Sequence, residues 1–145
     1  KCLLTLRIYM TAKKVNKYRS KLEANIALTL PEGFTYECTE LKYRKKTSRE
    51  MVCQSCGSHE IFQYAIYTPD FKLPNGIFLE TKGWLKPSDR TKMESVIACH
   101  PELDIRMVFQ YDGWTTKLKK QRYSDWCIKR KIKYCVAKIP EEWML

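Results

Sequence analysis

Hydrophobic and polar positions along the 145-residue chain change their spacing several times, in an order that predicts an α/β fold. Apolar side chains recur at helical spacing from about residue 16 to 30 and predict a helix that Pro31 and Gly33 end. Residues 34–43 alternate like a β-strand. Residues 44–60 are polar and charged, and we interpret them as a connector. Residues 1–15 fit no single pattern.

The second half of the chain predicts a strand, a helix and a strand in succession. Residues 77–82 are rich in β-forming side chains, and Ser88 is a candidate N-cap for a helix that runs to about Cys99. Residues 105–109 form the nearly continuous apolar run expected of a central strand. The crossover of this βαβ unit should be right-handed. A short helix near 124–131 and a strand near 132–136 complete the predicted sheet.

Residues 66–82 predict a β-hairpin, because a Pro-Asn-Gly turn signal at residues 74–76 separates two β-rich segments. Two registers are open. A two-residue loop would place Asp70 opposite Thr81, on the other face from Glu80. A three-residue loop, with Gly76 in the left-handed conformation, would place Asp70 opposite Glu80.

We favour the three-residue loop because it separates the polar side chains of the hairpin from the apolar ones. Asp70, Glu80 and Lys82 then share one face. The opposite face is apolar and would anchor the hairpin on the core; it carries Phe71, Leu73, Ile77 and Leu79.

The composition of the chain indicates what this polar face could bind. The chain has 27 Lys and Arg residues against 16 Asp and Glu, for a formal net charge of +11. A strongly basic surface suits a polyanion, whereas clustered carboxylates suit a divalent metal ion. Together they predict metal-dependent cleavage of nucleic acid.

Glu23 is a candidate for a third carboxylate, because it borders the apolar stripe of Leu22 and Ile26 on the first predicted helix. A solvated or ion-paired acid at the margin of the core is the alternative. Three acids and a backbone carbonyl could bind two Mg²⁺ ions. Lys82 would then orient the attacking water or offset charge on the scissile phosphate.

Length and cysteine content indicate the number of domains and the cellular compartment of the protein. The 145 residues suit one domain, and no apolar run is long enough for a membrane span. The first residues do not form a signal peptide, and seven cysteines is an odd number, so we expect a reducing compartment and mostly free thiols. The chain begins at Lys1, which leaves its natural N-terminus open.

A C-x₂-C-G sequence within the connector is a possible half of a zinc site. Cys53 and Cys56 would need two further ligands. Cys38 and His59 could supply them, or two subunits could each contribute the pair. The alternative is a chance thiol pair or a reversible disulfide.

Basic side chains gather at residues 42–46, 117–122 and 129–133. The middle group lies between a predicted strand and a predicted helix, where a loop could touch phosphates without reading sequence. The candidates for DNA contacts are Arg19, Lys117, Lys119, Lys120 and Arg122.

Several of these segments closely match one known group of proteins. Residues 67–83, which contain Thr68-Pro69-Asp70 and Glu80-Thr81-Lys82, form the longest matching run. Residues 100–106, the positions around Glu23, and residues 139–143 match in the same order. From about residue 17 to 143 the chain resembles bacteriophage endonuclease I, the podophage Holliday-junction resolvases of the PD-(D/E)xK nuclease superfamily.

That resemblance implies a restriction-endonuclease-like PD-(D/E)xK core in a single nuclease domain, residues 1–145. It implies that Asp70, Glu80 and Lys82 are catalytic, that Glu23 is a further acid, and that the Thr81 backbone carbonyl is a metal ligand. The expected cofactor is Mg²⁺, two ions per active site, with Mn²⁺ as a substitute. The C-x₂-C insertion departs from the family pattern.

The resemblance also implies an intertwined homodimer, in which residues 42–66 bridge the subunits and Glu23 acts in trans. The implied substrate is branched double-stranded DNA, and the implied location is the cytoplasm of an infected bacterial host. Two alternatives stay open: a restriction-like endonuclease on linear or mismatched duplex, and a non-catalytic basic DNA-binding protein.

Overall fold

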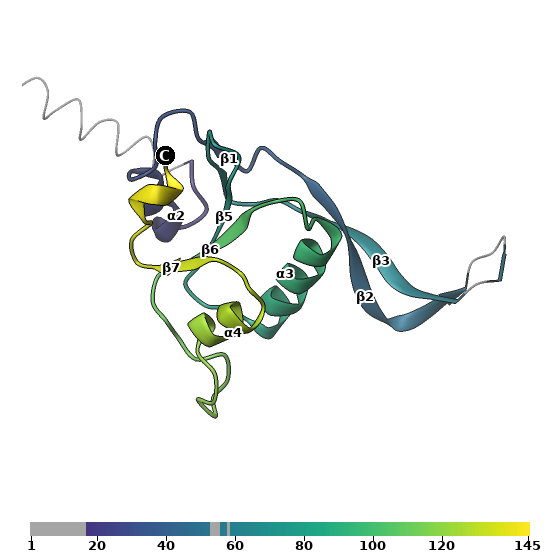
Figure 1. Cartoon of the computed structure of the whole chain (residues 1–145). Coiled ribbons are helices and arrows are strands. Elements are labelled where there is room, and N and C mark those ends of the chain that lie inside the picture. The colour runs from purple at the N-terminus through teal and green to yellow at the C-terminus, as the bar shows by residue number, and fades with distance from the viewer. Residues whose placement is uncertain (1–16, 53–55, 58) are drawn as a thin grey trace, which may run out of the picture.

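The computed structural model describes residues 17–52, 56–57 and 59–145, and its centre is a mixed β-sheet with helices on both faces (Figure 1). The described strands of this sheet follow the order β1-β4-β5-β6-β7. Their bounds are β1 Thr35–Tyr36, β4 Phe71–Lys72, β5 Phe78–Lys82, β6 Ile105–Phe109 and β7 Tyr134–Val136. The helices are α2 Lys21–Ala27, α3 Pro87–Cys99 and α4 Tyr123–Lys129, followed by the 3₁₀ turn η1 Glu141–Trp143. The predicted α/β class with a helix-flanked mixed sheet is confirmed.

The predicted strand–helix–strand unit is also confirmed. Strand β5 pairs in parallel with β6, and α3 connects them. Strand β7 adds in parallel on the other side of β6. Ser88 is not the N-cap, because α3 already begins at Pro87 after the extended Lys86. Proline fits the first turn of a helix, where its missing N–H would have no partner.

Side chains on the two faces of the sheet form separate cores. Along β6, Met107 and Phe109 pack on the α3 and α4 side, whereas Val108 packs on the α2 side. Strand β5 alternates in the same way, with Phe78 toward α3 and α4 and Leu79 toward α2. A parallel strand buried on both faces needs such a continuous apolar run.

The first helix is shorter than predicted. Ser20 caps α2 by accepting a hydrogen bond from the Glu23 backbone N–H, so the helix starts only at Lys21. Tyr18 lies before the helix yet is buried, with its ring 4.7 Å from that of Tyr36. Tyr18 continues the helical spacing of apolar residues although it lies outside the helix. For this reason the sequence predicted a helix that is too long at its N-terminal end. None of the helices within the described ranges is long and apolar enough to cross a membrane.

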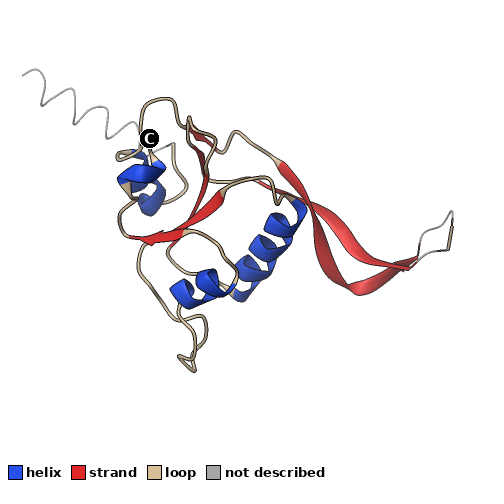
Figure 2. Cartoon of the chain, viewed as in Figure 1, coloured by secondary structure: helices blue, strands red, loops and turns tan. Residues whose placement is uncertain are grey.

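The predicted strand over residues 34–43 is split, and residues 44–52 and 59–60 of the predicted connector belong to two β-strands. Glu37, with a φ of 48°, separates β1 from β2 (Leu41–Val52). Strand β2 pairs antiparallel with β3 (His59–Tyr67), and this β2–β3 ribbon projects from the body (Figure 2). Leu41, Tyr43 and Tyr67 at the base of the ribbon belong to the core. Residues 44–50 are all polar or charged, so they lack the alternating apolar pattern that predicts a strand.

The hairpin adopts the three-residue loop. Phe71 pairs with Leu79, and Leu73 N–H donates to the Ile77 carbonyl at 2.8 Å. Gly76 has a φ of +89°, as that loop requires. The predicted apolar face is buried: Phe71, Leu73, Ile77 and Leu79 all belong to the core on the α2 side.

Gly76→Ala should lower the free energy of unfolding by about 1–2 kcal/mol, because an L side chain is disfavoured at positive φ. No atom lies within 4 Å of the added Cβ, so the cost comes from the backbone alone. Urea unfolding of the native chain and the variant measures it. Gly76→Asn is the matched control and should cost less, since asparagine tolerates this conformation. Equal losses for both variants would contradict the assignment.

Candidate active site

The hairpin register brings three of the predicted side chains together. Asp70 directly precedes β4, which pairs with β5, the strand that carries Glu80 and Lys82. The Lys82 ammonium is 2.8 Å from Glu80 Oε1. Asp70 Oδ2 accepts hydrogen bonds from the backbone N–H and the hydroxyl of Thr81, both at 2.7 Å. These contacts form an acid–amine cluster across the open end of the hairpin.

Tyr67 is a member of this cluster that sequence reasoning missed. Its hydroxyl donates to Glu80 Oε2 at 2.6 Å, and both side chains are buried. Burial, followed by the charge of Glu80, raises the pKa of Tyr67 well above its usual range, so the hydroxyl remains a donor. The β-rich pattern before Asp70 predicted a strand there but not which side chain would meet Glu80.

Burial and electrostatic repulsion shape the ionisation of the cluster. Burial first, and then the charge of Glu80, raises the pKa of Asp70 to about 7, against the opposing effects of Thr81 and Lys82. Burial acts to lower the pKa of Lys82, but the charge and hydrogen bond of Glu80 outweigh it, and the pKa is raised. Two neighbouring carboxylates therefore share one ammonium group.

Glu23 is held by residues close to it on the α2 side. Ser20 Oγ donates to Glu23 Oε1 at 2.7 Å, and the Tyr36 hydroxyl donates to Oε2 at 2.5 Å. A cavity of about 440 Å³ joins this buried acid to Thr81 and Lys82 of the same chain. We call it the Lys82 cavity; it is lined by Ser20, Lys21, Leu22, Glu23, Thr81, Lys82, Gly83 and Gln110.

Glu23 does not join the other two acids in one compact cluster. Alternation along β5 turns Glu80 toward the α3 and α4 side, whereas Glu23 belongs to α2 on the opposite side. Within the described parts of the chain, no group of three His, Cys, Asp or Glu side chains is close enough to hold a metal ion. Of the other predicted site residues, Lys82 and Thr81 line the same cavity as Glu23, whereas Asp70 and Glu80 do not.

The donor chemistry nevertheless fits a divalent cation. Asp70 Oδ1 has no hydrogen-bond partner among the described residues. Burial first, and then repulsion by Glu80, raises the pKa of Asp70, and a bound cation would offset that repulsion. Carboxylate and carbonyl oxygens are the ligands that Mg²⁺ prefers. The Thr81 carbonyl belongs to the residue that directly follows Glu80, and the backbone N–H of Thr81 donates to Asp70.

The predicted zinc ligands are only partly within the described residues. Cys53 and the side chain of His59 lie outside them. Cys38 precedes β2 and donates its thiol to the Tyr36 carbonyl, whereas Cys56 lies beyond the opposite end of this 12-residue strand. At about 3.3 Å per residue, that strand keeps them apart, so a site using Cys38 in the same chain does not fit this structure. A pair shared between subunits stays a prediction.

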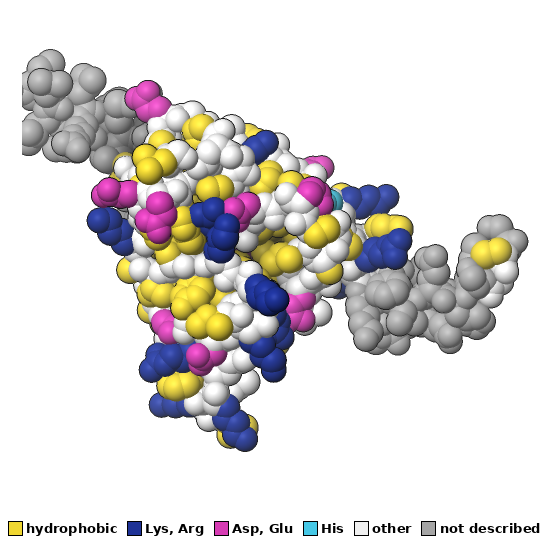
Figure 3. Space-filling view, viewed as in Figure 1, with side chains coloured by type: hydrophobic (Ala, Val, Ile, Leu, Met, Phe, Trp, Pro, Cys, Tyr) yellow, Lys and Arg dark blue, Asp and Glu magenta, His cyan; other side chains and the backbone are white. Residues whose placement is uncertain are grey.

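The predicted DNA-contacting cations are exposed. Lys117, Lys119, Lys120 and Arg122 lie on the loop between β6 and α4. Figure 3 shows Lys and Arg side chains gathered on this loop at the bottom of the view. Arg19 lies next to the α2 cap, with a 74% exposed side chain that pairs with Glu37 at 2.9 Å.

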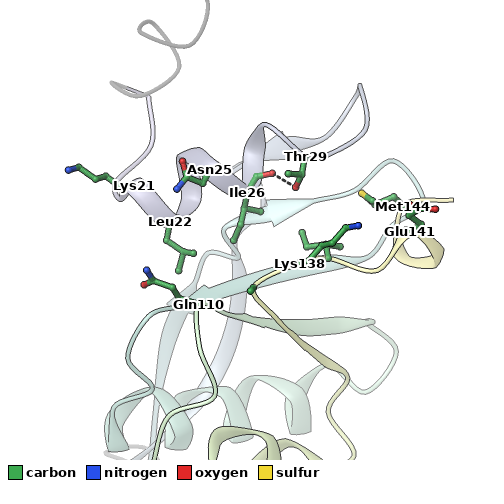
Figure 4. A pocket seen from close by; sticks show the side chains of 11 residues that line it. Lys21, Leu22, Asn25, Ile26, Thr29, Gln110, Lys138, Glu141 and Met144 are labelled. Carbon is green, nitrogen blue, oxygen red and sulfur yellow. Dashed lines mark hydrogen bonds between the residues drawn. The ribbon is translucent and has the colours of Figure 1, made fainter.

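A second cavity of about 660 Å³ continues from the Lys82 cavity between α2 and the C-terminal segment (Figure 4). The two cavities share Lys21, Leu22 and Gln110. Gln110 follows β6 and had no signal in the sequence that marked it as a site residue.

Asp70→Asn should change the pH dependence of stability in metal-free buffer. The folded chain holds the Asp70 proton up to about pH 7, whereas the ordinary pKa is 3.8, so native stability should fall as the pH rises between these values. The variant has no such carboxyl group and avoids this loss. Its free energy of unfolding at pH 8 should therefore exceed that of the native chain by a few kcal/mol, since a pKa difference of one corresponds to roughly 1.4 kcal/mol. Urea unfolding in EDTA at pH 5 and pH 8 measures it.

Exposed Glu32 offers a control for the same change of charge. Glu32→Gln should leave the difference between pH 5 and pH 8 as it is in the native chain. An advantage of Asp70→Asn that is equal at both pH values would contradict the raised pKa.

Comparison with known proteins shows the family of this chain. The family of phage endonuclease I matches residues 6–145. Endonuclease I of Escherichia phage T7 is 38% identical over 138 residues, which cover 91% of this chain and 81% of that protein. Endodeoxyribonuclease 1 of Enterobacteria phage T3 is 47% identical over 81 residues, 52% of this chain and 50% of that protein. The resemblance seen in the hairpin and its flanking segments is confirmed, and the chain belongs to the phage endonuclease I family.

Proposed function

We propose that this protein is a structure-selective endodeoxyribonuclease that resolves four-way and other branched DNA junctions by metal-dependent phosphodiester hydrolysis. The observation that carries the proposal is the convergence of Asp70, Glu80 and Lys82 at the open end of the hairpin, in a member of an endonuclease family. Two acids and an amine in this arrangement are the functional core of a PD-(D/E)xK site.

Each residue of the site has its own proposed role in the reaction. Asp70, Glu80, the Thr81 carbonyl and Glu23 would hold two Mg²⁺ ions, or Mn²⁺, which would activate water and offset charge on the leaving oxygen. Tyr67 keeps Glu80 oriented through Oε2, so that Oε1 can exchange its bond with Lys82 for another cation.

Lys82 would then be available to act on the substrate. Its side chain is 20% exposed and lines the Lys82 cavity. There it would orient the attacking water or stabilise charge that develops on the phosphate. Glu23 reaches the same cavity from the other face of the sheet.

A homodimer suits the proposed substrate, because a four-way junction needs two symmetric cuts. The β2–β3 ribbon is the proposed inter-subunit bridge, since its two strands pair with each other and project from the body (Figure 2). In one chain Glu23 already faces Lys82, so exchange of α2 between subunits would rebuild the same cavity with the partner's helix. The proposed site of action is the cytoplasm of the infected host.

The native chain should cut a labelled four-way junction near its branch point in Mg²⁺ and should leave linear duplex made from the same arms intact. Asp70→Asn should lower the rate by at least about a thousandfold, because a ligand and a negative charge are lost at the reacting centre. It should still bind the junction, since the substituted side chain no longer repels phosphate. Gel analysis of cleavage and a binding titration measure both.

Glu32→Gln makes the same change of charge on an exposed position and should cut normally. Normal cutting by Asp70→Asn would overturn the site assignment. Equal cutting of linear duplex and junction would favour a restriction-like nuclease, and tight binding without any cutting would favour a non-catalytic DNA-binding protein.

DNA affinity should depend steeply on salt, because each neutralised phosphate releases counterions. Replacing Lys117, Lys119 and Lys120 by Gln should lower the slope of log K against log salt by about one per lost phosphate contact. Binding to linear and branched DNA should weaken by similar factors, since phosphate contacts carry no sequence information. Fluorescence anisotropy between about 50 and 200 mM salt measures the slope. A slope unchanged by the triple substitution would exclude this loop from the interface.

A further inference from the structure

Exposed aromatic rings lie on the two segments that leave the sheet beside the Lys82 cavity. Trp84 follows β5 and is 61% exposed, and Tyr111 and Trp114 follow β6 at 51% and 36%. The other two tryptophans, Trp126 and Trp143, are only 1% and 7% exposed. Tryptophan exposure is therefore a local property of this edge of the protein.

Arg90 joins the two segments. Its guanidinium Nη1 donates to the Leu85 carbonyl at 3.2 Å and to the Thr115 carbonyl at 3.1 Å. These carbonyls belong to the residues that directly follow Trp84 and Trp114. Since both carbonyls bond to one nitrogen, the backbones next to the two tryptophans lie side by side.

Close packing fixes the third ring. Tyr123 is buried, and the centre of its ring lies 6.2 Å from the centre of the Tyr111 ring. Gly113 passes against both of them, and a Cβ at this position would lie 2.8 Å from atoms of each ring. Tyr111 is thus supported from the protein side while half of its surface faces solvent.

A cation accompanies each exposed tryptophan. The Lys86 ammonium lies 5.2 Å from the centre of the Trp84 ring, and Arg122 Cζ lies 4.3 Å from that of Trp114. The Arg122 guanidinium is also anchored, because it donates to the Asp112 carbonyl at 2.9 Å. A flat ring beside a positive charge matches a nucleotide, which offers a base to stack and a phosphate to neutralise.

The rings lie next to the candidate catalytic residues. Lys82 and Gly83 line the Lys82 cavity, and Trp84 comes next in the chain. Gln110 lines the same cavity and donates its backbone N–H to the Lys82 carbonyl at 3.1 Å, and Tyr111 follows it. A base on these rings would therefore belong to a nucleotide close to the bond that is cut.

We propose that Trp84 and Trp114, with Lys86 and Arg122, form a platform on which an unstacked base of the DNA substrate rests beside the cleavage site. This inference rests on the proposed nuclease function and specifies how a branch is recognised. Bases at a branch point lose a stacking neighbour more easily than bases within a continuous duplex, so a platform for one base favours branched DNA.

The test uses 2-aminopurine, a base whose fluorescence falls when it stacks, placed beside the branch of a four-way junction and also within a single strand. The full chain is titrated in EDTA, so that binding is measured apart from cleavage. We expect saturating native protein to quench the single-strand probe severalfold. Trp84→Ala and Trp114→Ala should each abolish most of this quenching and weaken junction binding about tenfold.

Two further variants guard against indirect effects. Trp84→Phe keeps an aromatic face and should retain part of the quenching. Tyr64→Ala removes a 57% exposed ring on the ribbon that also has a lysine, Lys42, 4.4 Å from its centre, and should quench like the native chain. Quenching at saturation that is equal in the native chain, Trp84→Ala and Trp114→Ala would overturn the platform.

Failure of the platform and failure of the proposed nuclease function have different signatures. Quenching that depends on Trp84 without cleavage of any branched DNA would leave the platform and remove the nuclease. Junction cleavage with tryptophan-independent quenching would do the reverse. A change in sedimentation of Trp84→Ala without DNA would instead assign the rings to contact with a second copy of the chain and overturn the proposal.

Discussion

The pairing of Phe71 with Leu79 is the constraint on which the rest of the site depends. Both side chains are fully buried, so the hairpin cannot slip by one residue without moving them to the opposite face. This register places Asp70 opposite Glu80. Fixing those two acids therefore requires no polar contact of their own, because the energy that holds them comes from apolar burial on the other face of the same strands.

The polar side of the hairpin is, by contrast, incompletely compensated. Glu80 has Lys82 and Tyr67 as partners, and Asp70 has Thr81, but a single ammonium serves one buried and one half-buried carboxylate. Burying charge without full pairing costs stability, and the raised pKa of Asp70 records that cost. The apolar packing of the two cores offsets this loss of stability. The arrangement is poorly suited to a structural ion pair and well suited to a site that a cation completes.

Local patterns predicted those parts of the protein whose side chains pack into the two cores. The hairpin was predictable because burial of one face imposes a period of two on its side chains, whereas β6 was predictable from a continuous apolar run, because both of its faces are buried. The β2–β3 ribbon had no strand signal over residues 44–50, because all of these residues are polar or charged. Tyr67 and Tyr36 were missed for another reason: each hydroxyl meets an acid 13 residues away, and only the tertiary fold sets that distance.

The same two tyrosines hold the two acids from different sheets. Tyr67 ends β3, pairs with Leu41 at the base of β2, and donates to Glu80. Tyr36 lies in β1, pairs with Phe71 within the five-stranded sheet, and donates to Glu23. A change in the angle of the ribbon would therefore move the donor at Glu80, whereas the donor at Glu23 is fixed to the sheet that carries the site. Of the two acids, Glu80 is thus the one whose hydrogen bond depends on the ribbon.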